Sequence, residues 1–256
     1  MPRARSGASE ATATGSTASA AEIARFAAQA SAWWDADGAF QPLHRINPGR
    51  LRFARDYIIG HFGRDGEAPR PLRGLDVIDI GCGGGLLCEP MRRLGASVTG
   101  IDGGAENILV AQAHARDAGL DIAYEVAVPE SLAAEGRAYD VVLNMEVVEH
   151  VADVDAFLAA SAALLRPGGA MVLSTINRTL RSLALAKVAA EYVLRWVPAG
   201  THDWRKFVRP SELAQGLRGG GVELVEIAGL VYRPLSGEWR IGRDVAVNYL
   251  AFARKG

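Results

Sequence analysis

A short apolar run followed at once by a cluster of glycines constrains the fold of this chain more than any other feature. Leu75–Ile80 has the length and composition of a buried parallel strand, and Gly81-Cys82-Gly83-Gly84-Gly85 leads from it straight into a helical pattern. Glycines let the backbone turn tightly and approach a ligand without a Cβ in the way, and the free amides at a helix start can bond a polar ligand group. This order predicts an α/β domain that binds a nucleoside-type ligand.

An acidic residue follows at the distance that such a domain requires. The next strand-like run, Ser97–Ile101, leads to Asp102, 21 residues after Gly81. In a parallel sheet this carboxylate lies beside the first loop and accepts hydrogen bonds from the ribose hydroxyls of an adenosine ligand. The alternative is an ordinary tight turn with Asp102 as a helix cap, and the correct order of the elements disfavours it. Leu86 stands where the dinucleotide fingerprint needs its last glycine, so an NAD-dependent oxidoreductase becomes the second choice.

Strand-like and helical patterns alternate along the middle of the chain, which predicts a parallel sheet with helices on both faces. Two later strand-like runs, Val222–Tyr232 and Val245–Phe252, are joined by a loop and are expected to pair antiparallel. The expected fold is therefore α/β and Rossmann-like, with a mostly parallel seven-stranded sheet and a C-terminal antiparallel hairpin. This is the sheet plan associated with class I methyltransferases. The other expected elements are helices at Leu86–Leu94, Ala105–Ala118, Val154–Leu165 and Ser211–Leu217, and strands at Ile122–Val126, Tyr139–Met145 and Ala170–Thr175.

The N-terminal part predicts a tail followed by a single domain. Residues 1–20 are rich in Ala, Ser, Thr and Gly and contain no large apolar side chain, so we expect a disordered tail. The single domain is expected over residues 21–256 and opens with an N-terminal helical region, residues 21–70. Its first helices are expected at Ala21–Trp34 and Leu51–Phe62, with a turn at Asn47-Pro48-Gly49 between them.

The composition excludes some classes of partner. Lys and Arg number 28 and Asp and Glu 29, a net charge of -1, so no electrostatic case exists for nucleic acid. No apolar run reaches the roughly 18 residues of a membrane span, and the N-terminus lacks both a signal-peptide core and the amphipathic face of a transit peptide. Two cysteines, Cys82 and Cys88, form no disulfide framework. We expect a cytoplasmic, bacterial-type protein rather than an organelle-targeted one.

Several segments resemble one known family, the ubiquinone-biosynthesis O-methyltransferases. The resemblance runs from about residue 21 to residue 252. Its most particular parts are Pro42-Leu43-His44-Arg45-Ile46-Asn47-Pro48 and Gly200-Thr201-His202-Asp203, whereas the glycine loop is common to many methyltransferases. The other matching segments are Phe26 with Ser31–Asp35, Asp79–Gly85, Met145–Val151, Ser174–Arg178 and Lys206-Phe207.

The resemblance implies both the reaction and the donor site. Members of the family transfer a methyl group from S-adenosylmethionine to phenolic hydroxyls of polyprenylated rings, with 2-polyprenyl-6-hydroxyphenol and 3-demethylubiquinol as substrates. It also implies a ubiquinone-biosynthesis complex as a partner. It places the methyl donor against Arg50, Gly81, Gly83, Asp102 and Met145. From the residues alone, Arg50 could equally be a surface ion-pair residue and Met145 an ordinary core residue.

Glu146, Glu149 and His150 follow the Tyr139–Met145 strand at the edge where ligands bind in such sheets. If the segment is helical, positions i, i+3 and i+4 share one face, and the three side chains could ligate a divalent metal such as Mg²⁺. A metal on an ortho-dihydroxy ring would lower the phenol's pKa, and the resemblance implies a metal here in some relatives. The alternatives are surface glutamates, or His150 acting alone as general base. His202 and Asp203 are second-rank candidates for substrate contact or for the base, with a capped loop as the alternative.

Residues 176–206 interrupt the alternation and are expected to form a substrate lid that also contacts a membrane. Within the segment, apolar residues accumulate between Leu180 and Val197, while Lys187, Glu191 and Arg195 recur every four residues as a polar stripe. Such a helix can lie in a bilayer interface with its cations near anionic lipid headgroups. This would attach the protein peripherally to the inner membrane. The alternative is a helix that only roofs the active site.

Overall fold

The computed structural model describes residues 16–184, 203–233 and 238–256. This part of the chain contains one sheet of eight strands in the order β3-β2-β1-β4-β5-β8-β6-β7. The first five strands along the chain pair parallel, and β6, β7 and β8 pair antiparallel. The strands are β1 (Asp76–Ile80), β2 (Ser97–Asp102), β3 (Ala123–Val126), β4 (Tyr139–Met145), β5 (Leu165–Ile176), β6 (Val222–Arg233), β7 (Glu238–Gly242) and β8 (Asn248–Lys255).

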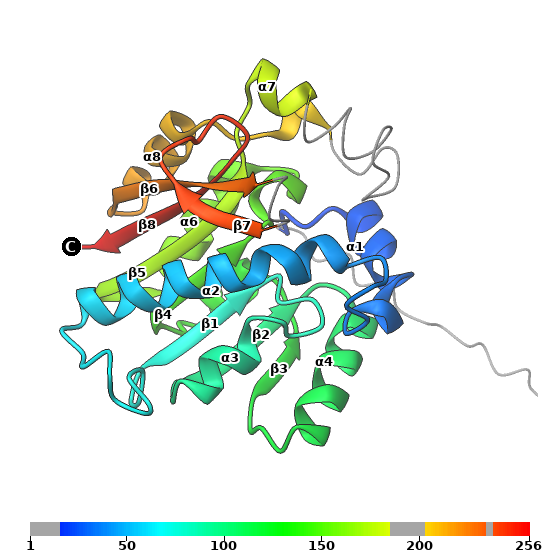
Figure 1. The fold of residues 1–256 in the computed structure, drawn as a ribbon. Coiled ribbons are helices and arrows are strands. Elements are labelled where there is room, and N and C mark those ends of the chain that lie inside the picture. The colour runs from blue at the N-terminus through cyan, green and yellow to red at the C-terminus, as the bar shows by residue number, and fades with distance from the viewer. Residues whose placement is uncertain (1–15, 185–202, 234–237) are drawn as a thin grey trace, which may run out of the picture.

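Helices cover both faces of this sheet (Figure 1). On one face α2, α3 and α4 share a hydrophobic core with the sheet, and on the other α5, α6 and α8 do. The predicted fold class is thereby confirmed. The helices are α1 (Ala20–Ala27), α2 (Gln41–His61), α3 (Cys88–Arg93), α4 (Ala105–Asp117), α5 (Pro129–Ala134), α6 (Val154–Ala163), α7 (Leu180–Ser182) and α8 (Pro210–Gly219), with 3-10 turns η1 (Ala30–Ala32), η2 (Val148–His150) and η4 (Trp204–Lys206).

Alternation along the central strands explains why two cores form. Val141 and Leu143 of β4 belong to the core under α2, whereas Val142, between them, belongs to the core under α6. Successive side chains of a strand point to opposite faces, so a strand buried on both sides is apolar throughout. The continuous apolar run that marked β4 in the sequence has this cause.

The turn predicted at Asn47-Pro48-Gly49 is wrong, because α2 continues through Pro48 from Gln41 to His61. The buried side chains of this helix include Ile46, Phe53, Ala54 and Ile58, which recur at helical spacing on both sides of the proline. Packing of this stripe on the sheet overrides the local turn preference of the tripeptide. The loss of one backbone hydrogen bond at Pro48 is tolerated for the same reason.

The C-terminal strands pair antiparallel as predicted, but the sheet has one strand more than the seven expected. β6 pairs antiparallel with β8, and β8 pairs antiparallel with β5. The additional strand is β7, which pairs with β6 at the edge of the sheet. Its sequence, Glu-Trp-Arg-Ile-Gly, is polar and mostly solvent-accessible, so it carries no apolar run that would mark it as a strand.

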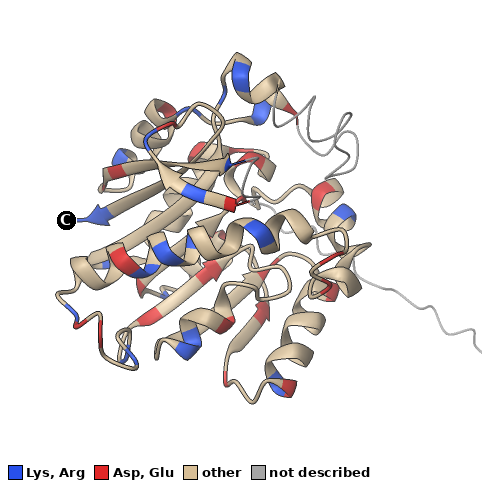
Figure 2. Ribbon diagram, viewed as in Figure 1, with Lys and Arg blue, Asp and Glu red and all other residues tan. Residues whose placement is uncertain are grey.

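The expected tail ends earlier than residue 20. Thr17 is buried, its backbone N–H donates to Glu130, and Ala18 forms an isolated antiparallel bridge with Val151. Residues 1–15 lie outside the described residues. Acidic and basic residues are interspersed along the ribbon in Figure 2, in keeping with the net charge of -1. Among the helices in the described ranges, none is long and apolar enough to cross a membrane.

Candidate active site

The carboxyl ends of β1, β2 and β4 meet at one edge of the sheet and bring three predicted donor residues together. Ile80 of β1 is paired with Ile101 of β2 and with Asn144 of β4. The next residues in the chain are Gly81, Asp102 and Met145, so parallel pairing alone aligns them at the same edge. All three line one cavity of about 380 Å³, a size typical of a small-molecule site.

The glycine loop adopts backbone conformations that other residues rarely enter. Gly81 has φ +70° and Gly83 has φ +53°. A Cβ at Gly81 would lie 2.6 Å from Val147, and one at Gly83 would lie 2.4 Å from the Trp33 ring. Both the turn and the close approach of other segments therefore require glycine at these two positions.

Asp102 is held in place by three donors from the protein. Its Oδ2 accepts from the Gly83 amide at 3.0 Å, and its Oδ1 accepts from the Gly104 amide at 2.8 Å and from Asn107 Nδ2 at 3.0 Å. The carboxylate is thus tied to Gly104, the residue before α4, and still lines the cavity. The N-cap of α4 is Gly104 and the helix start has no side-chain cap, so Asp102 is not the helix cap that we set against the ligand role in the sequence.

The segment between α1 and α2 covers the glycine loop with two tryptophans. Trp33 Nε1 donates to Asn107 Oδ1 at 2.8 Å, and Trp34 Nε1 donates to the Gly84 carbonyl at 2.9 Å. Trp33 also stacks on Phe40 with a ring separation of 3.8 Å. This cover fixes the loop from the solvent side.

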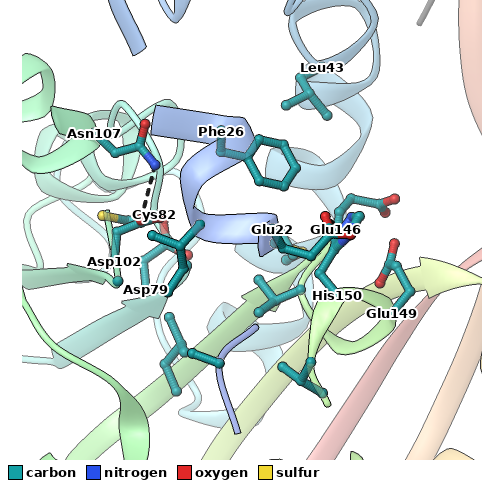
Figure 3. A pocket seen from close by; sticks show the side chains of 18 of the residues that line it. Glu22, Phe26, Leu43, Asp79, Cys82, Asp102, Asn107, Glu146, Glu149 and His150 are labelled. Atoms are coloured by element: carbon teal, nitrogen blue, oxygen red, sulfur yellow. Dashed lines mark hydrogen bonds and ion pairs between the residues drawn. The ribbon is translucent and has the colours of Figure 1, made fainter. Parts of the chain in front are cut away.

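The cavity has two chemically different ends, which Figure 3 shows. Asp79 of β1, Cys82 of the glycine loop and Asp102 of β2 lie at one end. The other end holds three carboxyl groups and one imidazole, which are labelled in Figure 3: Glu22, Glu146, Glu149 and His150. Phe26 and Leu43 add apolar surface from α1 and α2. The arrangement can hold a polar ligand at the loop beside an apolar ring at the charged end.

Arg50 is not the surface residue that the sequence left open. It is 4% exposed and lines the cavity, and its Nη2 lies 2.8 Å from Glu146 Oε1. Its Nε has no hydrogen-bond partner among the described residues. A buried guanidinium with an unsatisfied donor suits a carboxylate ligand, since an unpaired buried donor is costly.

The condition that we set for Glu146, Glu149 and His150 to share one face, a helical segment, is not met. Glu146 has φ +57°, and only Val148–His150 forms a short 3-10 turn. Each side chain has its own partner: Glu146 pairs with Arg50, Glu149 accepts from the Thr175 hydroxyl at 2.7 Å, and His150 Nδ1 lies 3.2 Å from Glu22.

The two buried carboxyls have pKa values shifted in opposite directions. Burial raises the pKa of Glu149, and the neighbouring negative charge of Glu146 raises it further. Burial opposes ionisation of Glu146 too, but Arg50 outweighs this and holds the pKa of Glu146 below its ordinary value. Within the described ranges no group of three or more His, Cys, Asp or Glu side chains is placed to hold a metal ion. In this arrangement the three residues do not fit a divalent cation.

A buried acid lies under the donor end. Asp79, the last acidic residue of β1, is 3% exposed, and burial raises its pKa to about 7. The Cys88 thiol donates to it at 3.3 Å. Burial likewise raises the pKa values of the Cys82 and Cys88 thiols, and both side chains belong to the core under α2.

Two further candidates, His202 and Asp203, belong to the 176–206 segment, and only Asp203 lies within the described residues. His202 and residues 185–201 lie outside the described residues, so the predicted catalytic role of His202 stays a prediction. Asp203 caps η4, where its side chain accepts from the Arg205 amide at 3.0 Å. The capped loop that we considered as the alternative is therefore present at Asp203.

The sequence did not single out two residues of this site. Glu22 reaches the charged end from α1, and Asn107 joins Asp102 to Trp33 from α4. Glu22 lay in the expected opening helix without any motif of its own, and Asn107 stood one turn into a helix. The Trp33-Trp34 pair was the one local signal that this part of the chain packs on the loop.

Comparison with known proteins agrees with this geometry. The family model described as "Methyltransferase domain" matches residues 50–227. A protein of Paramagnetospirillum magneticum named ubiquinone biosynthesis O-methyltransferase is 54% identical over 240 residues, 94% of this chain and 96% of the relative. A protein of the same name from Chelativorans sp. is 52% identical over 93% of this chain and 94% of the relative. The chain belongs to the ubiquinone biosynthesis O-methyltransferase family.

Solved structures with similar folds are more distant members of the methyltransferase class. One is magnesium protoporphyrin IX methyltransferase of Synechocystis with bound SAH, with a TM-score of 0.57, 21% identity and coverage of 83% of this chain and 86% of that one. Another is an S-adenosylmethionine-dependent methyltransferase of Clostridium acetobutylicum, with a TM-score of 0.60, 12% identity and coverage of 91% and 98%. At these identities the likeness concerns the fold. Membership of the ubiquinone biosynthesis O-methyltransferase family sets aside the NAD-dependent oxidoreductase that was our second choice.

Proposed function

We propose that the protein transfers the methyl group of S-adenosylmethionine to phenolic hydroxyls of polyprenylated rings, namely 2-polyprenyl-6-hydroxyphenol and 3-demethylubiquinol. The observation that carries the proposal is the meeting of Arg50, Gly81, Asp102 and Met145 around one cavity, in a chain that matches the family over nearly its whole length. Family membership supports the substrate class, and the cavity supports the way in which the two substrates meet.

The donor end of the cavity suits each polar part of S-adenosylmethionine. Asp102, with its orientation fixed by three donors, can accept from ribose hydroxyls. Arg50 offers an unsatisfied buried Nε to the carboxylate of the amino-acid part. Gly81 has no Cβ, so the backbone there can approach the ligand closely. When bound, the donor supplies an activated methyl group on a positively charged sulfur, so the protein has mainly to hold the two substrates in line.

The charged end of the cavity suits the acceptor ring. Phe26 and Leu43 supply apolar contacts for the ring, and His150 lines the same space. Burial and the negative charge of Glu146 raise the pKa of Glu149 to about 7. Our candidate general base is His150, whose imidazole lines the cavity and can take the phenolic proton. His202 is the second candidate and stays a prediction.

A divalent metal such as Mg²⁺ is a separate proposal, which rests on the types of residue at Glu146, Glu149 and His150. As these side chains are arranged, each faces a different partner, so Glu146 would have to leave Arg50, and Glu149 and His150 would have to turn from Thr175 and Glu22, before they could share an ion. No step of the mechanism is therefore derived through a metal. The direct test is methyl transfer after exhaustive chelation, with Mg²⁺ added back in a parallel sample.

We further propose that the protein works in the cytoplasm and contacts anionic lipid through residues 176–206. A polyprenylated ring is too apolar to reach the enzyme through water, so the enzyme should meet it at a bilayer. Leu180, at the start of α7, is 78% exposed, which supports this surface role. Residues 185–202, which carry the predicted amphipathic stretch, lie outside the described residues. Membership of a ubiquinone-biosynthesis complex is a proposal that follows from the family alone.

The function is tested by methyl transfer to a short-chain catechol analogue, followed by mass detection of the methyl ether. We expect product with S-adenosylmethionine, and calorimetric binding of this donor but not of NAD. The matched variant is Asp102→Ala, which should bind the donor more weakly while remaining folded. Absence of any methylated phenol with the intact protein, donor and acceptor present, would overturn the proposal.

A further inference from the structure

We propose that Asn107 of α4 is a positioning residue for donor binding, which holds the Asp102 carboxylate toward the ribose and links it to Trp33 in the segment over the glycine loop. The inference rests on the proposed function, because it assumes that Asp102 receives the ribose hydroxyls of the donor. It extends the donor site from the strand ends to a side chain of the N-terminal segment, which then contributes to donor affinity through Asn107.

The side chain of Asn107 is buried and hydrogen-bonded at both ends of its amide. It is 1% exposed, lies in the first turn of α4 and lines the cavity. Its Nδ2 donates to Asp102 Oδ1 at 3.0 Å (Figure 3), and its Oδ1 accepts from Trp33 Nε1 at 2.8 Å. Both bonds join α4 to other parts of the chain. A buried amide is costly unless it is bonded, so these two contacts explain why an asparagine is tolerated here.

An asparagine amide suits these two partners because one of its ends donates and the other accepts. The indole N–H of Trp33 can only donate, and the carboxylate of Asp102 can only accept. With Trp33 bonded to Oδ1, Nδ2 has to face Asp102. An amide turned the other way would set donor against donor and acceptor against acceptor. Trp33 therefore fixes the orientation of the amide, and the amide fixes the carboxylate.

The two other donors to Asp102 are backbone amides, and they leave Asn107 a separate role. They belong to Gly83 in the glycine loop and to Gly104, the residue before α4. Asn107 shares the Oδ1 atom of Asp102 with Gly104. A Cβ at Gly104 would lie 3.0 Å from Asn107 Nδ2 and 3.2 Å from Asp102 Oδ1, so a glycine at this position leaves room for the bond. Asn107 is thus the donor that connects Asp102 with the N-terminal segment.

Trp33 is held firmly enough to serve as a fixed point for this chain of hydrogen bonds. It is 7% exposed, and its ring stacks on Phe40 with a centroid distance of 3.8 Å and an angle of 5°. A Cβ at Gly83 would lie 2.4 Å from the same ring, so the ring packs directly on the glycine loop. The contacts from Trp33 through Asn107 to Asp102 therefore depend on how this segment packs on the loop.

Donor affinity should consequently depend on side chains that act only through Asp102. A carboxylate that is held in one orientation loses less freedom when the ribose hydroxyls bind to it. Without the Asn107 amide, Asp102 keeps only its two backbone donors. Without the Trp33 N–H, the Asn107 oxygen is left buried and unbonded, and the amide can turn away from Asp102.

The first test measures the Kd for S-adenosylhomocysteine by titration calorimetry on full-length Asn107→Ala and Trp33→Phe, with circular dichroism to verify the fold. Since the net value of one hydrogen bond corresponds to about 2- to 13-fold in affinity, we expect Asn107→Ala to bind roughly 3- to 10-fold more weakly. Trp33→Phe, which keeps an aromatic ring and loses the N–H, should bind about threefold more weakly.

Gln112→Ala is the matched control for these variants. It removes another amide side chain of α4, whose Nε2 donates to the Tyr124 carbonyl at 3.2 Å, away from the residues that line the cavity. Its Kd should differ from that of the intact protein by less than about twofold. An equal loss of affinity in Gln112→Ala and Asn107→Ala would show a general effect of α4 and would overturn the proposal.

Asn107→Asp separates positioning from packing. It keeps the shape of the side chain and an acceptor for Trp33, but it sets a second carboxyl against Asp102. Two adjoining carboxyls share a proton at low pH and repel each other once both are ionised. The Kd of Asn107→Asp should therefore be within about threefold of the intact protein at pH 5 and roughly tenfold or more weaker at pH 8. A ratio of the two Kd values that does not change with pH would contradict the proposal.

A double variant decides whether Asn107 acts through Asp102. If it does, Asn107→Ala combined with Asp102→Ala should bind the donor no more weakly than Asp102→Ala alone. Additive losses, or an unchanged Kd in Asn107→Ala, would overturn the positioning role. An unchanged Kd in Trp33→Phe would overturn the part assigned to Trp33. If Asp102→Ala itself binds as the intact protein does, the proposed donor site is wrong, whereas the methyltransferase function fails separately, by absence of product from the intact protein.

Discussion

At the scale of single residues, the donor site depends on how Asp102 is held. Three hydrogen bonds from Gly83, Gly104 and Asn107 fix its carboxylate before any ligand arrives. A group that is already oriented loses little conformational freedom on binding, so its hydrogen bonds to a ligand are used more fully. These three contacts thus prepare the residue for a ligand.

We predict that Asp102→Ala weakens S-adenosylmethionine binding by roughly 10- to 150-fold, because a lost charge-assisted hydrogen bond costs about 1.5–3 kcal/mol. Isothermal titration calorimetry measures the effect, and circular dichroism verifies the fold. The variant also frees the Gly83 amide, so we expect a small loss of thermal stability. An unchanged Kd in a folded variant would remove Asp102 from the donor site.

Asp79 gives a prediction on stability against pH. Its folded pKa, about 7, lies above the unfolded value, so the folded state retains a proton that the unfolded state has lost. The contribution of this group to stability is therefore full below about pH 4 and is lost as the pH rises through about 7. We expect Asp79→Asn to flatten this part of the profile, by at most about 4 kcal/mol between pH 4 and pH 8. Urea unfolding of both donor-free proteins at pH 4 and pH 8 measures this change in unfolding free energy. The same change with pH in the intact protein and in Asp79→Asn would contradict the prediction.

The sequence predicted the donor residues better than the acceptor end, for a physical reason. Gly81, Asp102 and Met145 each follow a strand, and parallel pairing brings strand ends together without further information. Glu22 meets His150 through a contact between segments far apart in the chain, which no local pattern encodes. The positive φ of Glu146, which breaks the expected helix, was also without a signal in the sequence.

At the scale of elements, apolar patterns predicted every strand of the sheet except β7, and the expected turn within α2 was wrong. The buried stripe of α2 runs through Pro48, so the helical period was the better guide than the turn tripeptide. β7 pairs along one edge only and is polar, so its sequence contains no apolar run or alternation that would predict a strand.

The packing of Trp33 on the glycine loop yields an element-scale prediction. In Gly83→Ala the new Cβ would lie 2.4 Å from the Trp33 ring, and φ +53° is strained for any residue with a Cβ. We expect the unfolding free energy to fall by about 1–3 kcal/mol and donor affinity to fall as the segment around Trp33 is displaced. The control is Gly60→Ala in α2, where a Cβ meets open space, and which should be neutral or slightly stabilising. Equal stability of the two variants would contradict the packing argument.

At the scale of the whole molecule, the active site is formed jointly by the edge of the sheet and the N-terminal helices. The cavity receives side chains from α1, α2, α4 and the ends of three strands. If residues 176–206 contact a bilayer, as we propose, the acceptor would reach the enzyme from that bilayer.

We predict that the protein co-sediments with anionic liposomes at low salt and less so at high salt, since cations near such a surface contribute about 1 kcal/mol each. Arg178 already pairs with Glu212, and Arg181 with Asp244 at 2.6 Å. A glutamate at either position would face an acid, so Arg178→Gln/Arg181→Gln/Lys187→Gln is the cleaner variant. This variant should reduce co-sedimentation. The reduction should be smaller than the removal of three unpaired cations would give, because two of these arginines are already paired with acids.

The control for this experiment is Arg64→Gln/Arg70→Gln/Arg73→Gln, which loses the same charge in the loop between α2 and β1. It should bind liposomes as the intact protein does. If the intact protein stays in the supernatant at low salt, the membrane contact is wrong and residues 176–206 act at most as a lid.

The position of β8 has a consequence for how the protein is made. β8 lies between β5 and β6 in the sheet, although it follows both along the chain. A ribosome therefore releases β6 and β7 while the strand that joins them to the rest of the sheet has not yet been synthesised. Until then the β6–β7 hairpin and the free edge of β5 are exposed, and such edges invite aggregation. The nascent chain should need protection by a chaperone during this interval, and a stall placed between β7 and β8 should expose it.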